Sequence, residues 1–165
     1  LYFSDGAVEL AVNLMKSGRG FTIVTDTNMA LAGVNKAALK QLNGTVRCFM
    51  ADPDVAAEAK ERGVTRAIVS MERAATLAGP VIFAIGNAPT ALIRLYEMMQ
   101  KGEIHPDFII GTPVGFVNVV ESKELICQSS VPCIVARGRK GGSNIAAAVC
   151  NALMYQVTRT QKSGK

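Results

Sequence analysis

A short apolar run ends abruptly in the turn-forming residues Gly-Asn-Ala-Pro-Thr, at positions 86–90. Residues 81–85 read Val-Ile-Phe-Ala-Ile, and a helical pattern follows the turn at once. This order predicts a buried strand, a tight turn and a helix whose first backbone N–H groups are open. Such N–H groups, at the positive end of a helix dipole, bind carboxylate or phosphate oxygens. The candidate contacts are Gly86, Asn87, Ala88, Pro89 and Thr90.

A second candidate anion site is rich in both glycine and cations. Residues 137–143 read Arg-Gly-Arg-Lys-Gly-Gly-Ser and stand between an apolar run and a helical pattern. Glycines among three cations predict an anion nest, and a flexible basic surface loop is the alternative. The spacing matches neither a Walker loop nor the fingerprint Gly-x-Gly-x-x-Gly of dinucleotide-binding folds. The candidate contacts are Arg139, Gly142 and Ser143.

Two more polar or glycine-rich loops follow apolar runs. Asp-Thr-Asn at 26–28 either forms only a turn or orients polar groups of a ligand. Gly-Thr-Pro-Val-Gly-Phe-Val-Asn at 111–118 is unusually apolar for an exposed loop, and its glycines let the backbone approach a flat ligand closely. The candidate contacts are Asp26, Thr27, Asn28, Pro113, Val114 and Gly115.

Three polar residues near these loops have less certain roles. Lys36 is expected to meet a ligand carboxylate. Ser122 is expected to cap a helix that opens in residues 121–124 and is also a candidate contact of the substrate. Lys123 is either an exposed surface residue or a second anion contact.

His105 is the obvious candidate for a catalyst, because it is the single histidine of the chain. It precedes the apolar run 108–110, which places it at the amino edge of the predicted sheet. The loops described above lie at the carboxyl edge, roughly 15 to 20 Å away for a strand of five or six residues. We therefore predict that His105 is not catalytic and that the sequence holds no Ser-His-Asp or Cys-His set.

The elements that position these loops alternate between apolar strands and amphipathic helices. The predicted strands are 21–25, 46–50, 81–85, 108–110 and 133–136, and the predicted helices are 6–15, 35–41, 54–62, 64–78, 90–100 and 142–155. Right-handed βαβ units then predict a three-layer α/β/α sandwich around a five-stranded parallel, flavodoxin-like sheet of order 2-1-3-4-5. Its switch point brings the loops after strands one and three to a single crevice.

One connection is longer than a simple crossover requires, because two helical patterns separate the second and third strands. The second pattern, residues 64–78, carries apolar residues at helical spacing. An extra apolar helix needs a partner surface. That surface is either the same domain or a second copy of the chain, and we predict a homodimer with residues 66–77 at or beside its interface.

Length and composition exclude several classes of protein. The 165 residues predict one domain over 1–157 followed by a basic, solvated tail over 158–165. The net charge of +5 is mild and aromatics are only 5%, which disfavours nucleic acid, and no apolar run is long enough to span a membrane. The four cysteines lack metal or redox spacing, so we expect reduced packing thiols in a cytoplasmic protein and no metal site.

Five segments resemble one known family, the precorrin-8X methylmutases. They are VTDTNMALAGVNK (24–36), GVTRAIVSMERA (63–74), AIGNAPTALIRLYEM (84–98), IGTPVGFVNVVESKE (110–124) and GRKGGSNIAAAVCNAL (138–153). The wording Asp-Thr-Asn-Met at 26–29 looks most like the cobalt-precorrin-8 branch. The resemblance runs from about residue 3 to residue 153.

The resemblance implies an isomerase of cobalamin biosynthesis that moves a methyl group from C-11 to C-12 of a corrin macrocycle. It implies no organic cofactor, since any cobalt is carried by the substrate, and it adds Thr65 and Arg66 to the substrate site. A flat apolar ring rimmed with carboxylates agrees with the glycine-rich loops and with cations at Lys36, Arg66, Lys123, Arg139 and Lys140.

The resemblance also implies that the family's catalytic histidine lies in a segment upstream of Leu1, which His105 does not match. The catalytic residue is therefore unknown from this sequence, and we expect an N-terminal segment to be missing from it. Two other functions stay open: a non-catalytic corrinoid carrier or regulator, and a nucleotide-binding flavodoxin-like module. The upstream segment distinguishes the first from the enzyme, and mononucleotide binding identifies the second.

Overall fold

The apolar runs pair into one sheet in the computed structural model, which describes residues 1–164. Within those residues the sheet has six strands in the order β1-β6-β5-β4-β2-β3. The strands are β1 (Tyr2–Phe3), β2 (Phe21–Thr25), β3 (Gly44–Cys48), β4 (Val81–Ile85), β5 (Phe108–Gly111) and β6 (Cys133–Val135). All neighbouring pairs are parallel except β1 with β6. The expected number of five strands is therefore wrong, because Tyr2 and Phe3 add an antiparallel edge strand to β6.

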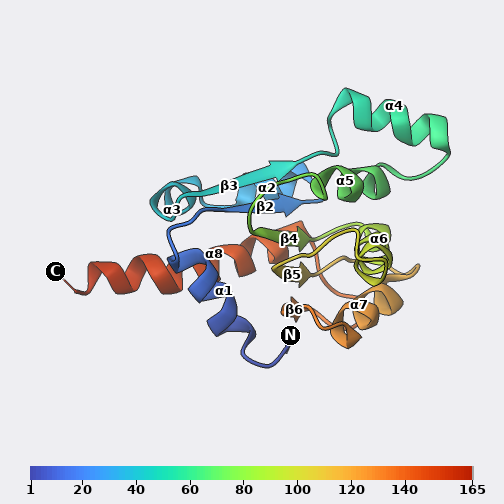
Figure 1. Cartoon of the computed structure of the whole chain (residues 1–165). Helices are drawn as coiled ribbons and strands as arrows, with labels where there is room; N and C mark the ends of the chain where they lie inside the picture. The colour runs from blue at the N-terminus through green and yellow to red at the C-terminus, as the bar shows by residue number, and fades with distance from the viewer. Residues whose placement is uncertain (165) are drawn as a thin grey trace.

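Helices cover both faces of the sheet (Figure 1). They are α1 (Ala7–Lys16), α2 (Asn28–Gly33), α3 (Lys36–Gln41), α4 (Pro53–Arg62), α5 (Arg66–Ala74), α6 (Pro89–Gln100), α7 (Val119–Gln128) and α8 (Ser143–Lys162). Alternate side chains of each central strand enter opposite cores. In β4, Phe83 packs with α4, α5, α6 and α7, whereas Ile82 packs with α1, α3 and α8. The arrangement is an α/β fold of three layers.

The connection between β3 and β4 folds into a pair of helices. In Figure 1, α4 lies farther from the sheet than α5, and α5 lies between α4 and the strands. Three buried residues of α5, Val69, Met71 and Ala74, join the core that contains β4 and α6. The apolar face of α5 is thus covered within the chain. The sequence left open whether this helix packs against its own domain or against a second copy of the chain. In the structure it packs against its own domain.

Three helix boundaries differ from the sequence-based expectation. The six-residue helix α2 was not predicted, because it begins at Asn28, within the segment 26–28 that was expected to be a polar loop. The last helix continues to Lys162 instead of fraying from residue 158, since Val157 and Thr158 are buried. The chain of α8 extends past the edge of the sheet in Figure 1.

Helix α7 begins earlier than expected. Its first residue is Val119, and Asn118 before it adopts the left-handed conformation with φ 59°. Ser122 therefore lies inside the helix rather than at its cap. Its hydroxyl is buried and donates to the Val119 carbonyl over 2.8 Å.

None of the helices in residues 1–164 is both long enough and apolar enough to cross a membrane.

Candidate functional site

The turn after β4 is closed by a carboxylate of the chain itself. The buried Asp26 side chain accepts hydrogen bonds from the backbone N–H groups of Gly86 (2.8 Å), Asn87 (2.9 Å) and Ala88 (2.6 Å). The expectation that these groups are open to a ligand anion is therefore wrong. The N–H groups of this turn do bind an anion, but that anion is the Asp26 carboxylate.

Two opposing effects act on the Asp26 carboxyl group. Burial raises its pKa, and the three backbone donors lower it. Burial is the larger effect, so the pKa of Asp26 lies above its ordinary value. The carboxylate joins the end of β2 to the start of α6, and it leaves Asn87 exposed at the carboxyl edge of the sheet.

The loop after β2 reaches the N-terminus of α8. The Thr27 hydroxyl lies 2.7 Å from the Ser143 hydroxyl and accepts a hydrogen bond from the Ala30 N–H, which caps α2. Gly86 also packs here, because a Cβ at this position would lie 2.6 Å from the Ser143 Cα. A threonine followed by good helix formers is a cap signal, and it would have revealed α2 in the sequence.

The loops after β5 and β6 are bonded to each other. Gly142 donates its N–H to the Thr112 carbonyl over 2.8 Å, and the Thr112 hydroxyl contacts the Gly142 carbonyl at 3.3 Å. A Cβ on Gly141 would lie 2.1 Å from the Thr112 oxygen, so this approach requires glycine. Farther along, Gly115 donates to the Arg139 carbonyl over 3.3 Å.

Lys123 lies beneath these loops rather than on the surface of the site. The residue is 0% exposed, and its ammonium donates to the carbonyls of Gly138 (2.7 Å) and Lys140 (2.8 Å). Burial lowers the pKa of this ammonium. Of the two roles that the sequence left open for Lys123, the surface residue is excluded, and its present hydrogen bonds go to the protein itself.

The N-termini of α5 and α6 lie side by side. The Thr65 hydroxyl accepts from the Ile68 N–H as the cap of α5 and lies 3.3 Å from the Thr90 hydroxyl. Arg66, the first residue of α5, is exposed, and within residues 1–164 no carboxylate forms an ion pair with it. Thr65 thus contacts the helix that begins at the turn after β4, and Arg66 is its neighbour in sequence.

Lys36 is not brought into this group. Its ammonium donates to the carbonyls of Leu31, Ala32 and Val34 at the end of α2. Within residues 1–164 its ammonium forms no hydrogen bond with another expected site residue. The expectation that Lys36 meets a ligand carboxylate has no support in this geometry.

Large apolar side chains stand exposed around the carboxyl edge. Phe116 is 83% exposed, Val117 78% and Met29 71%, and Val114 is also exposed. We call these four residues the apolar shelf. The Arg139 guanidinium lies 5.9 Å from the centre of the Phe116 ring. Met29, Phe116 and Val117 were not predicted as contacts, although the apolar character of residues 111–118 was a usable signal.

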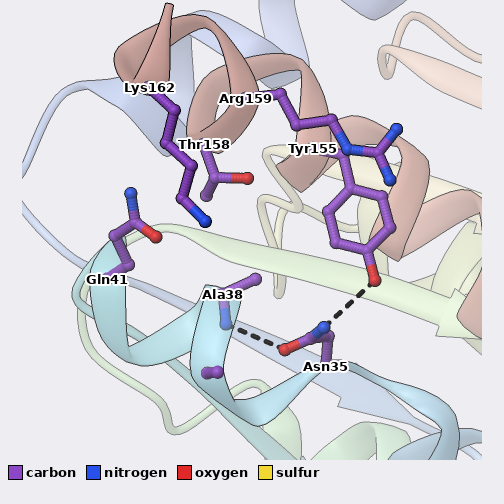
Figure 2. A pocket seen from close by; sticks show the side chains of 8 residues that line it. Asn35, Ala38, Gln41, Tyr155, Thr158, Arg159 and Lys162 are labelled. Atoms are coloured by element: carbon purple, nitrogen blue, oxygen red, sulfur yellow. Dashed lines mark hydrogen bonds between the residues drawn. The ribbon is translucent and has the colours of Figure 1, made fainter. Parts of the chain in front are cut away.

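The described residues offer a hollow elsewhere that contains none of the expected site residues. A cavity of about 190 Å³ lies between α3 and α8. Figure 2 shows the Asn35 side chain bonded to the Ala38 N–H and to the Tyr155 hydroxyl at its rim.

His105 is exposed in the loop before β5, at the amino edge, and is likewise remote from the carboxyl-edge loops.

Side chains that could bind a metal are dispersed in the described part of the chain. No group of three His, Cys, Asp or Glu residues is clustered within residues 1–164. The four cysteines are free thiols. Burial raises the pKa of Cys127 to about 11 and that of Cys150 to about 12, so both are protonated at neutral pH.

Comparison with protein families gives a match along nearly the whole chain. The family model described as precorrin-8X methylmutase matches residues 1–156. Curated relatives agree. A cobalt-precorrin-8 methylmutase of Priestia megaterium is 41% identical over 93% of this chain and 67% of its own length. A protein of the same name from Salmonella typhimurium is 42% identical over 95% of this chain and 72% of its own length.

A third curated relative and a solved structure are similar as well. A precorrin-8X methylmutase of Pseudomonas aeruginosa is 43% identical over 93% of this chain and 73% of its own length. The structure of a precorrin-8X methylmutase from Thermus thermophilus superposes with a TM-score of 0.84 at 35% identity. That superposition covers 96% of this chain and 77% of the other.

Proposed function

Because the chain belongs to the precorrin-8X methylmutase family, we propose that its carboxyl-edge site binds precorrin-8X or its cobalt form and isomerises it. The protein is an isomerase of cobalamin biosynthesis. Relatives named as methylmutases do not favour the carrier or regulator that the sequence left open.

The proposed reaction moves one methyl group within the substrate. The bond from that methyl to C-11 breaks as the bond to C-12 forms, so the substrate and the product, hydrogenobyrinate or cobyrinate, have the same atoms. Such an intramolecular shift needs no external oxidant or reductant. The work of the chain is to bind and orient the ring and to favour its rearranging state.

One observation carries the choice of substrate class: the apolar shelf stands beside the Arg139 guanidinium, which has no carboxylate partner within residues 1–164. Arg66 and Arg139 are both exposed, and within residues 1–164 neither forms an ion pair. A flat ring matches exposed Phe116 and Val117, and carboxylates at the rim of that ring match the two guanidinium groups.

The remaining site residues are proposed to shape the crevice. Thr27, Asn28, Asn87 and Thr90 supply polar groups at its rim, while Pro113 and Gly115 fix the course of the shelf. Asp26 acts indirectly by holding the turn after β4.

The proposal extends to the assembly, the location and the cofactor. A homodimer is supported by exposed apolar side chains, which include Phe3, Val8 and Leu10 on β1 and α1. Free thiols agree with a cytoplasmic protein. We assign no resident cofactor, because any cobalt is held by the substrate macrocycle.

A visible absorption titration with hydrogenobyrinate and with cobyrinate tests the proposal. We expect a saturable spectral shift with at least one of the two products. Phe116→Ser should weaken binding, whereas Leu10→Ser, which removes an exposed apolar side chain on α1, should not. The proposal fails if neither corrinoid binds, or if a mononucleotide binds in their place.

A further inference from the structure

We propose that Lys123 is a positioning residue: its buried ammonium orders the basic loop, residues 137–142, so that Arg139 is presented to the substrate. The proposal rests on the proposed function, since it assigns a ligand carboxylate to Arg139. Lys123 itself touches no ligand in this assignment.

The positive charge of Lys123 lies in an unusual environment. Lys123 is 0% exposed, and within residues 1–164 no Asp or Glu pairs with it. Removing an ammonium from water costs several kcal/mol unless hydrogen bonds replace the lost hydration. An apolar side chain of similar length would fill the same space without that cost. The cation is therefore best explained by what it holds.

The two hydrogen bonds of the Lys123 ammonium reach the centre of the basic loop. The ammonium donates to the carbonyls of Gly138 and Lys140, which are the residues on either side of Arg139. The carbonyl of Arg139 itself accepts from the Gly115 N–H. Three consecutive carbonyls of the basic loop are thus fixed, and the Arg139 side chain extends toward the Phe116 ring.

Apart from the Gly115 bond to Arg139, the basic loop has few attachments at this point. The basic loop has no helix or strand of its own between the end of β6 and the start of α8. Its first residue, Arg137, pairs with Glu124 through two bonds of 2.8 and 2.7 Å, but Arg137 is exposed, and such pairs contribute little. Its last residue, Gly142, is bonded to Thr112. Lys123 supplies the central attachment.

The consequence is preorganisation. A guanidinium group on a disordered loop must be immobilised when the substrate binds, and that loss of freedom reduces affinity. A loop held by Lys123 has already been ordered during folding. Removal of the ammonium should therefore weaken substrate binding through Arg139 while the rest of the fold stays intact.

A double-mutant cycle tests this dependence. Lys123→Met and Arg139→Ala should each weaken hydrogenobyrinate binding about tenfold. The double variant should be weakened little further, because Lys123 acts through Arg139. Lys101→Met, which removes an exposed lysine after α6, is the matched control and should bind like the wild type. Additive effects, or unchanged binding by Lys123→Met, would overturn the proposal.

A second measurement separates this proposal from the proposed function. Hydrogen exchange of the amides in residues 138–142, without ligand, should be about tenfold faster or more in Lys123→Met than in the wild type. Unchanged exchange contradicts the positioning role, whatever the ligand. Failure of the wild type to bind any corrinoid contradicts the proposed function and with it the role of Arg139. If Lys123→Met does not fold, Lys123→Gln replaces it in both measurements. This variant keeps hydrogen-bond donors for the carbonyls but loses the ammonium charge, so its exchange rate and its affinity should be intermediate. Wild-type values for Lys123→Gln would contradict the proposal.

Discussion

Two buried charges near the carboxyl edge use the backbone in complementary ways. The Asp26 carboxylate accepts from three N–H groups, and the Lys123 ammonium donates to two carbonyls. Each fixes a loop that has no regular structure. Replacing either charge with an apolar side chain would leave these backbone groups without that partner.

Asp26→Asn should destabilise the fold. An amide side chain keeps one oxygen acceptor and turns an NH₂ group toward backbone donors, so at least one of the three bonds is lost. We expect the free energy of unfolding in urea to fall by about 3 kcal/mol, on the scale of one or two hydrogen bonds to a charged group. Asp5→Asn, at an exposed position, is the control. Equal unfolding midpoints for wild type and Asp26→Asn would show that the carboxylate does not hold the turn.

Arg66→Ala should weaken corrinoid binding without affecting folding. The exposed guanidinium of Arg66 is suited to a bidentate bond with a peripheral carboxylate, and a loss of about 1.5 to 3 kcal/mol of binding energy is the scale of such a bond. Arg66→Lys should recover only part of it. The measurement is the dissociation constant from the absorption titration, with Arg19→Ala as an exposed control. Unchanged binding by Arg66→Ala would indicate that Arg66 points to solvent.

The helices α4, α5 and α6 are joined by a network of ion pairs in addition to their apolar contacts. Glu72 of α5 binds Arg62 at 2.5 and 3.1 Å and Arg94 at 3.0 Å. The hydrogen bond from Arg62 lowers the pKa of Glu72 below its ordinary value, and Arg94 adds to the shift. The network connects the outermost helix to the helix that begins at the site.

This network predicts an acid-sensitive attachment of α4. Ionised Glu72 is favoured in the folded chain, so its contribution is present above the pKa of the unfolded state, near 4.5. It is lost as the pH falls through the lower pKa of the folded state. The protection of the amides in residues 53–62 against hydrogen exchange, relative to their intrinsic rate at each pH, should therefore fall below about pH 4.5. In Glu72→Gln this pH dependence should be reduced, and an identical profile would contradict the role of the pair.

Close packing between the loops after β5 and β6 predicts a second effect at this scale. Gly141→Ala places a methyl group 2.1 Å from the Thr112 oxygen, so the loop must move. Gly111→Ala is a matched control, because its nearest contact is a Leu92 side chain at 3.4 Å. We expect Gly141→Ala to lower both the melting temperature and corrinoid affinity, and Gly111→Ala to lower them much less. Similar losses in both variants would contradict the tight approach.

At the scale of the whole molecule, exposed apolar side chains gather in two regions. One is the apolar shelf at the carboxyl edge, and the other includes Leu1, Phe3 of β1, and Val8 and Leu10 of α1. The apolar face of α5, which first suggested an interface between copies, is covered within the chain. The homodimer remains a prediction, and its support now comes from these exposed regions.

Light scattering at micromolar concentration should give twice the mass of one chain. Leu10→Glu should shift the mass to that of a monomer if α1 contributes to the interface, because a buried unpaired charge is costly. Glu9→Gln, next to it on α1, should remain dimeric. A monomeric wild type would refute the dimer.

Local pattern determined much of this protein. Strands β2 and β4 begin and end at the expected residues, and the loops after β2, β4, β5 and β6 meet at one edge of the sheet. Continuous apolar runs and turn residues carry this information in the sequence itself. The motifs in these loops were also sufficient to identify the family, which the comparisons confirmed.

The tertiary structure alone decided what the polar groups at that edge do. Asp26 and the turn at Gly86 are 60 residues apart, so no local pattern reveals that the carboxylate accepts hydrogen bonds from the N–H groups of that turn. From the sequence alone, Lys123 could be an exposed surface lysine. Only the fold shows that it is buried and bonded to the basic loop. The antiparallel pairing of Tyr2 with Val135 likewise depends on a distant partner. A residue's type and its neighbours in sequence set its chemistry, but its hydrogen-bond partner is set by which distant segment packs against it.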